Sequence, residues 1–200
     1  MVQRLRIESG DASAGWIEDA MTVLHNGELL VLPTETVYGV AADPNARGAL
    51  DALYRAKHRP QERAIAILVE GVEAARRDGA RFNAISERLA ANYWPGPLTL
   101  VLGAKEGERG YRVPDHPVPL ALLRAWGGPL AVSSANRSGY PPAQTADEAE
   151  EALGECVALV LDAGPVSGGV ASTVVRVREE TCEILREGAI PAAIIRECTR

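Results

Sequence analysis

The sequence LPTETVYGVAADPNARGALDALYRAKHRP, residues 32–60, contains the end of a strand, a polar loop, a helix and a cationic cluster in succession. The apolar run of residues 29–32 leads into it and is typical of a buried strand. The hydroxyl-rich residues 33–36 follow as a loop, and an amphipathic pattern predicts a helix over residues 46–56. Because a strand that leads through a loop into a helix is the unit of α/β folds, this stretch indicates the fold class.

On both sides of this stretch, strands and helices alternate along most of the chain. Apolar or alternating patterns predict strands over residues 3–8, 28–32, 64–69, 98–102, 111–113, 129–133 and 157–161. Amphipathic patterns predict helices over residues 14–25, 46–56, 82–93, 117–126 and 146–153. Near the end, strands over residues 172–177 and 182–186 follow one another. The order predicts an α/β fold with an open, twisted, mixed parallel and antiparallel sheet flanked by helices.

Particular residues support these predictions. The core strands would be anchored by Val31, Leu68, Leu100, Leu130 and Val160. Asp11 or Ser13 can cap the helix over residues 14–25, and Asp43 or Asn45 the helix over residues 46–56. We expect one domain over residues 1–200, with a core from about residue 18 to residue 190.

The composition is that of an ordinary globular protein, with 46% hydrophobic and 24% charged residues. The formal net charge of −6 argues against binding nucleic acid through bulk charge. Cys156, Cys182 and Cys198 have no metal-site spacing, and their odd number argues against a disulfide framework. We see no signal peptide and no apolar run of the ~18 residues that span a bilayer. We therefore expect a cytoplasmic protein without a membrane segment.

A cluster of cationic side chains stands against this acidic background. It consists of Arg55, Lys57, His58, Arg59 and Arg63. Cations favour helix C-termini through the helix dipole, but one or two would suffice there. The surplus suggests a bound anion, most simply a phosphate. Only two of the 21 cationic residues are lysines, which draws attention to Lys57.

Further polar groups follow other predicted strands. Residues 133–139 (SSANRSG) offer hydroxyl, amide and backbone donors of the kind that hold phosphate oxygens, although an ordinary turn has the same composition. Arg112 and Arg186 suit carboxylate or phosphate recognition, although single arginines are mostly surface residues. There is no GxxxxGK[ST] or GxGxxG motif, no nucleophile elbow and no histidine pattern for a metal. The residues alone predict an α/β protein with an anion-binding site.

Several motifs occur together in a characteristic order. They are PTETVYG (33–39), KHRP (57–60), WPGPLTLVL (94–102), RVPDHP (112–117), SSANRSG (133–139), STVV (172–175) and ILREGAI (184–190). With them the chain resembles the YrdC-like family, the threonylcarbamoyl-AMP synthases, over nearly its whole length. It looks like the short, single-domain form of that family.

The resemblance implies a reaction in which L-threonine, bicarbonate or CO2 and ATP give threonylcarbamoyl-AMP and pyrophosphate. Such a reaction requires that two anions are oriented and their charge neutralised, without an obligatory protein nucleophile. Mg2+ is expected with ATP, held by the phosphates. The product would pass to transferase proteins that form N6-threonylcarbamoyladenosine (t6A) in tRNA.

The resemblance also assigns residues. Catalytic roles, and contacts to the ATP phosphates, fall on Lys57, Arg59, Ser134 and Asn136. Pro142 and Arg186 complete the expected ATP site. The expected L-threonine site consists of Thr34, Arg112, Val132 and Ser172. No metal ligand is implied on the protein. We expect alanine at Lys57 or Arg59 to abolish activity and, as exposed surface changes, to alter stability by at most about 1 kcal/mol.

The chain departs from the family pattern at three positions. Ala64 replaces a frequent proline, Leu68 a frequent histidine and Arg176 a frequent aspartate. Two alternatives remain beside the synthase. One is a module that binds double-stranded RNA or tRNA on a basic concave surface, and the other is a carbamoyl-adenylate-forming enzyme with a different acceptor.

Overall fold

The computed structural model describes residues 2–8, 14–179 and 181–199. Its strands are β1 (Gln3–Arg6), β2 (Leu30–Leu32), β3 (Gly39–Ala42), β4 (Ala66–Leu68), β5 (Leu98–Gly103), β6 (Glu108–Arg112), β7 (Leu130–Ser134), β8 (Leu159–Asp162), β9 (Thr173–Arg178) and β10 (Thr181–Arg186). Its helices are α1 (Ala14–His25), α2 (Ala49–Ala56), α3 (Val72–Arg77), α4 (Ala84–Tyr93), α5 (Pro117–Trp126), α6 (Ala146–Leu153), the 3-10 helix η1 (Gly154–Cys156) and α7 (Ala192–Cys198).

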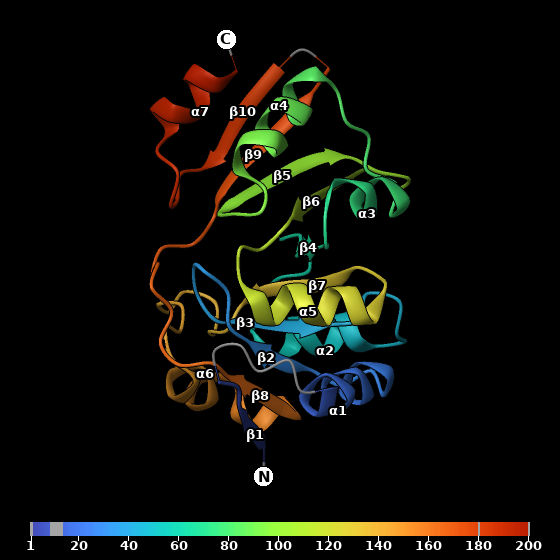
Figure 1. The fold of residues 1–200 in the computed structure, drawn as a ribbon, viewed down its shortest axis with the longest axis vertical. Coiled ribbons are helices and arrows are strands. Elements are labelled where there is room, and N and C mark those ends of the chain that lie inside the picture. Colours follow the sequence, from blue (N-terminus) through green and yellow to red (C-terminus); the bar gives the residue numbers. More distant parts are fainter. Residues whose placement is uncertain (1, 9–13, 180, 200) are drawn as a thin grey trace.

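The strands form one sheet in the order β1-β8-β2-β3-β7-β4-β6-β5-β9-β10. Four neighbouring pairs are parallel, namely β1–β8, β2–β8, β4–β6 and β5–β9, and the other pairs are antiparallel. Figure 1 shows the termini at opposite ends of the long axis, with β1 near one end and β10 near the other. The predicted α/β class, with a mixed sheet flanked by helices, is confirmed.

Alternate residues of the strands face two separate cores. In β2, β7 and β8, one set packs with α1 and α5, and includes Leu30, Leu32, Leu130, Val132, Leu159 and Leu161. The intervening residues Val31, Ala131 and Val160 belong to a larger core with α2, α3, α4, α6 and α7. This period of two is the expected consequence of the β-pleat. Helices α1 and α5 therefore cover only one half of one sheet face.

Local signals fix both ends of the helix α5. Pro117 occupies its first turn, and the N-cap His116 accepts a hydrogen bond from the backbone N–H of Val118 at 3.2 Å. Gly127 ends it in the left-handed conformation with φ 70°. The predicted range of this helix is confirmed.

Four elements were missed by the sequence patterns: β3, α3, η1 and α7. Gly39–Ala42 has neither alternation nor β-branched enrichment, but it is buried throughout between β2 and β7. The helix predicted from residue 46 begins at Ala49, because Gly48 precedes it with φ 78°. The predicted cap by Asp43 or Asn45 was therefore wrong, and Asp43 instead accepts a hydrogen bond from the N–H of Asn45. The predicted caps Asp11 and Ser13 lie outside the described residues.

Candidate functional site

A cavity of about 440 Å³ lies on the sheet face that α1 and α5 leave uncovered. Its floor comes from alternate residues of four strands: Ala66 and Leu68 of β4, Glu108, Gly110 and Arg112 of β6, Thr99 and Val101 of β5, and Val174 and Arg176 of β9. The intervening residues of the same strands, such as Tyr111 and Val175, belong to the larger core. The alternation of the pleated strands thus places polar and charged side chains such as Glu108, Arg112 and Arg176 in the cavity, while Tyr111 and Val175 face the core.

Four arginines line this cavity: Arg176, and three that come from separate parts of the chain, Arg59, Arg112 and Arg186. Partial burial, followed by the charges of Arg112 and Arg59, lowers the pKa of Arg186. Burial is also the main cause that lowers the pKa of Arg59. Because the charges of Arg112 and Arg59 both disfavour the charged form of Arg186, the cavity has a positive field that favours an anionic ligand.

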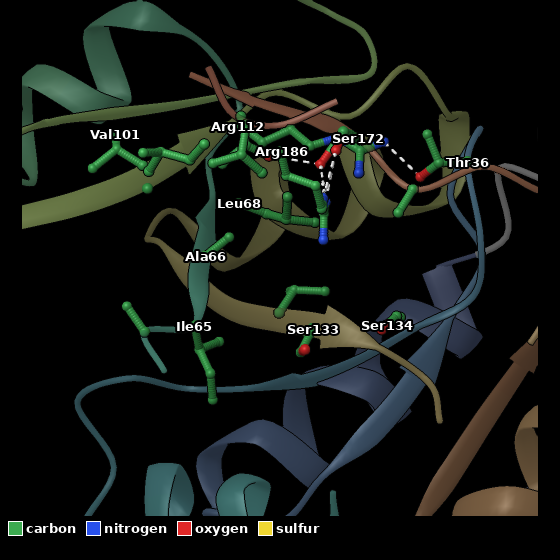
Figure 2. A pocket seen from close by; sticks show the side chains of 18 of the residues that line it. Thr36, Ile65, Ala66, Leu68, Val101, Arg112, Ser133, Ser134, Ser172 and Arg186 are labelled. Atoms are coloured by element: carbon green, nitrogen blue, oxygen red, sulfur yellow. Dashed lines mark hydrogen bonds between the residues drawn. The ribbon is translucent and has the colours of Figure 1, made fainter. Parts of the chain in front are cut away.

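Arg112 is the most enclosed of the three, with 7% of its surface exposed. Its Nε donates a hydrogen bond to the carbonyl oxygen of Gly96 at 3.2 Å, and its Nη2 donates to Thr36 Oγ1 at 2.8 Å. Nη2 also lies 2.7 Å from Glu35 Oε1. In Figure 2 the bond between Arg112 and Thr36 is one of the dashed lines at the rim of the cavity.

Arg186 is held by the segment that opens β9. Its Nη2 donates to the carbonyl oxygen of Ser172 at 2.6 Å, and its Nε donates to the same oxygen at 3.2 Å. The Ser172 hydroxyl shares a hydrogen bond of 2.8 Å with the hydroxyl of Thr99. Figure 2 shows Arg186 and Ser172 on the same side of the cavity as Arg112, with Ser133 and Ser134 across from them.

Lys57 lies beneath the loop that follows β7, and only 1% of its surface is exposed. Its ammonium group donates to the carbonyl oxygen of Ser134, to the carbonyl oxygen of Asn136 at 2.8 Å and to Asn136 Oδ1 at 3.4 Å. It does not line the cavity. The assumption that Lys57 is an exposed surface residue was wrong, because Lys57 is buried and its ammonium group holds the loop after β7.

The loop after β7 is fixed from both ends. Asn136 is 8% exposed and donates from Nδ2 to the carbonyl oxygens of Arg137 at 3.0 Å and Tyr140 at 2.7 Å. The N–H of Ser138 donates to the carbonyl oxygen of Lys57 at 2.8 Å. Lys57 and Asn136 thus shape the loop that brings Ser134 to the cavity wall.

The structure brings most of the expected residues together. Thr34, Arg59, Arg112, Val132, Ser134, Ser172 and Arg186 all line the cavity. Lys57, Asn136 and Pro142 are not among its lining residues. The Thr34 hydroxyl donates to the carbonyl oxygen of Val37 at 2.6 Å and accepts the N–H groups of Thr36 and Val37, both at 3.2 Å. Thr34 therefore shapes the loop as well as facing the site. The functional roles of all these residues stay predictions.

The cavity also has lining residues that the sequence did not single out, among them Ile65, Val101, Glu108, Gly110, Val174 and Leu185. The only signal for most of them was alternation along a strand, which does not show which face is uncovered. Ala64, Leu68 and Arg176, the three departures from the family pattern, all line the cavity.

The acidic groups at the cavity are engaged with arginines. The two oxygens of Glu108 accept from Arg178 at 2.6 and 3.0 Å, and this pairing lowers the pKa of Glu108. Arg176 Nε lies 3.3 Å from the same carboxylate. Among the described residues, no group of three or more histidine, cysteine, aspartate or glutamate side chains could hold a metal ion. The arrangement is that of an α/β protein with a cationic, hydroxyl-lined pocket for an anion.

Comparisons with known proteins give the family. The Sua5/YciO/YrdC family model, described as "Telomere recombination", matches residues 22–188. A Mycobacterium leprae protein with the provisional name threonylcarbamoyl-AMP synthase is 41% identical over 203 residues, which cover 94% of this chain and 89% of that protein. The threonylcarbamoyl-AMP synthase of Vibrio parahaemolyticus is 32% identical, over 86% of this chain and 98% of its own. The chain belongs to the Sua5/YciO/YrdC family.

The chain is also similar in structure to a solved protein. The structure of P. abyssi Sua5 complexed with L-threonine matches with a TM-score of 0.90 and 29% identity, over 99% of this chain and 60% of that one. The chain thus spans about 60% of the length of that Sua5 protein. Among the described residues, no helix is both long and apolar enough to span a membrane.

Proposed function

We propose that this chain is an L-threonylcarbamoyladenylate synthase, a nucleotidyltransferase-type enzyme that uses ATP and serves t6A modification of tRNA. The observation that carries the proposal is the convergence of Arg59, Arg112 and Arg186 on one cavity of about 440 Å³. The names of the relatives agree with it.

The chemistry suits a site built from cations and hydroxyl groups. The amine of threonine condenses with bicarbonate to a carbamate and water. A carbamate oxygen then attacks the α-phosphorus of ATP, and the bond between the α-phosphorus and its bridging oxygen breaks as pyrophosphate leaves. Negative charge gathers on the phosphate oxygens in this step, so preorganised donors lower its barrier. No protein nucleophile is needed.

The residues divide between the two substrates. The ATP phosphates would contact Arg59, Arg186 and Ser134, and the threonine end would use Thr34, Arg112, Val132 and Ser172. All of these line one cavity, which supports the assignment. Lys57 and Asn136 act on ATP through the loop that carries Ser134, since the ammonium of Lys57 binds that loop. Pro142 follows the same loop and keeps its predicted role beside the nucleotide.

Mg2+ would enter with ATP and neutralise phosphate charge. The acidic side chains beside the cavity, Glu35 and Glu108, each pair with arginine. This donor set fits an ion held mainly by phosphate oxygens rather than by a protein cage. The transferase proteins and tRNA that would receive the product belong to the same proposal, as does a cytoplasmic location. RNA binding stays a separate prediction.

The test measures pyrophosphate release by the purified protein with ATP, threonine and isotopically labelled bicarbonate. Release should require all three substrates, and mass spectrometry should find the label in threonylcarbamoyl-AMP. Arg112→Ala should reduce kcat/KM for threonine by about 100-fold or more, because a charge-assisted carboxylate contact is lost.

Arg109→Ala is the matched control. Arg109 belongs to the same strand as Arg112 but pairs with Asp78, at 3.4 Å, and does not line the cavity. The activity of the Arg109→Ala variant should stay within about twofold of the wild-type activity, as for other substitutions of surface residues. Pyrophosphate release that does not depend on threonine would contradict the proposed function.

A further inference from the structure

We propose that Glu35 is a positioning residue for the amino-acid end of the site, where it holds and partly neutralises Arg112. The inference rests on the proposed function. Glu35 does not line the cavity, so any effect on substrate passes through the arginine that it touches.

The contact between the two side chains is close and enclosed. Glu35 Oε1 lies 2.7 Å from Arg112 Nη2, with 17% and 9% of the respective side chains exposed. Both carboxylate oxygens are buried, and among the described residues neither has a partner with hydrogen-bond geometry. The short distance between Glu35 Oε1 and Arg112 Nη2 makes the contact an ion pair, although the angles between the two groups do not meet the geometry of a hydrogen bond. A buried carboxylate without hydrogen bonds is costly, which points to a role beyond folding.

Each N–H group of the Arg112 guanidinium can be followed to its acceptor, which shows which of these donors remain free for a ligand. Nε is used by the carbonyl oxygen of Gly96, and Nη2 by Thr36 and Glu35. Nη1 donates to no residue that the structure describes. Since a guanidinium is rigid and planar, fixing Nε and Nη2 also fixes the direction of both Nη1–H bonds. Arg112 lines the cavity, so these two donors are available for a ligand carboxylate.

The charge of Glu35 matters because Arg112 has cationic neighbours. Arg112 contributes to lowering the pKa of Arg186, which shows that the two charges interact across the site. The ion pair offsets this repulsion and keeps Arg112 in place. The pairing also leaves Arg112 with less net positive charge than Arg59 or Arg186, neither of which has a carboxylate partner among the described residues. This difference would favour a monoanionic carboxylate over a polyphosphate at Arg112.

The experiment compares Glu35→Gln with the wild type by calorimetric titration of the full chain with L-threonine and, separately, with ATP. Glutamine keeps the shape but removes the charge. The dissociation constant for threonine should rise about 10- to 100-fold, as expected for loss of one charge-assisted contact. The dissociation constant for ATP should change less than about threefold, because the phosphate-end arginines are untouched. If Glu35 had a purely structural role, the substitution would weaken the binding of threonine and of ATP to the same extent.

Glu183→Gln is the matched control. Its carboxylate accepts from Arg176, another cavity arginine, at 3.0 Å, but its side chain is 61% exposed. Threonine affinity should not change in this variant. If Glu35→Gln does not fold, Glu35→Asp keeps the charge with a shorter reach and should still weaken threonine more than ATP.

The outcomes separate the inference from the function on which it rests. Wild-type protein that binds ATP but no threonine would overturn the proposed function itself. If the wild type binds threonine and the Glu35 variant binds it with the same affinity, only the proposed role of Glu35 is overturned. An equal loss for threonine and ATP would do the same.

Discussion

Lys57 illustrates how one buried charge can organise a binding loop. Its ammonium group donates to three oxygens of residues 134–136, and the loop it supports forms part of the cavity wall. Burial and, to a smaller extent, the charge of Arg59 lower the pKa of Lys57 from 10.5 to about 8. The protonation of this lysine therefore changes in a pH range that is accessible to kinetic measurement.

We predict that kcat/KM for ATP falls above about pH 8 as one proton is lost. Above that pH the neutral amine has two N–H groups for three acceptors, so the loop is held less firmly. Saturating ATP should move the corresponding fall in kcat to higher pH, because phosphate charge favours the protonated lysine. A pH–rate profile at low and at saturating ATP measures both effects, and a flat profile up to pH 10 would contradict them.

Unfolding should not explain that loss of activity. The folded pKa of Lys57 lies below its ordinary value, so between about pH 8 and 10.5 the unfolded chain binds more protons. The contribution of Lys57 to the free energy of unfolding consequently rises with pH in this window, while activity falls. Denaturant titrations at pH 8 and 9.5 provide the control.

The segment between β8 and β9 is the element that joins the two halves of the sheet beside the site. The N–H of Gly169 donates to the carbonyl oxygen of Thr36 at 2.8 Å. The N–H of Val166 donates to the carbonyl oxygen of Gln144 at 2.9 Å. A Cβ at Gly168 would clash with the carbonyl oxygen of Glu35. Only glycine fits this close backbone approach, so the segment and the loop of residues 33–36 are packed together.

Gly168→Ala should lower the free energy of unfolding by about 1–3 kcal/mol, the usual cost of overpacking. It should also raise KM for threonine, because the added methyl group displaces the loop that holds Arg112. Urea titration and steady-state kinetics measure the two effects. The control is Gly71→Ala, since a Cβ there meets nothing within 4 Å and its φ of 175° is extended. Equal behaviour of the two variants would contradict this view of the segment.

At the scale of the whole molecule, one continuous sheet links the halves that carry the two ends of the chain (Figure 1). The cavity draws residues from β3 and β7 on one side and from β5, β6 and β9 on the other. Because neither half contains the site alone, we keep the prediction that residues 1–200 fold as one domain. The tryptophans allow a direct test, since α1 and α5 contain Trp16 and Trp126, whereas Trp94 donates to the carbonyl oxygen of Leu98 at the start of β5.

We predict a single cooperative unfolding transition with the same midpoint in both halves. Trp94→Phe leaves fluorescence from one half, and the double variant Trp16→Phe, Trp126→Phe leaves fluorescence from the other. Each midpoint should coincide with the far-UV circular dichroism midpoint of the same variant. Two separate transitions within one variant would show that the halves unfold as independent domains.

Much of the fold could be predicted because many helices and strands have local sequence patterns that indicate them. The helix Pro117–Trp126 carries its own start and stop signals, and the apolar runs at β2, β4 and β5 are long enough to indicate buried strands. Gly39–Ala42 has no such pattern and becomes a strand only because β2 and β7 supply its hydrogen bonds on both sides. The short helices α3 and α7 were missed for a similar reason, since helices of six and seven residues gain most of their stability from packing.

Local composition and ordered motifs were sufficient to predict the fold class, the family resemblance and the residue types of an anion-binding site. The set of residues that share the cavity could be seen only in the folded chain, since residues from strands far apart in sequence meet on one uncovered face. The folded chain also shows that Lys57 holds a loop from below and that Glu35 faces Arg112. The physical reason is that burial and pairing of a charge depend on neighbours brought by the fold, which neither spacing nor motif records.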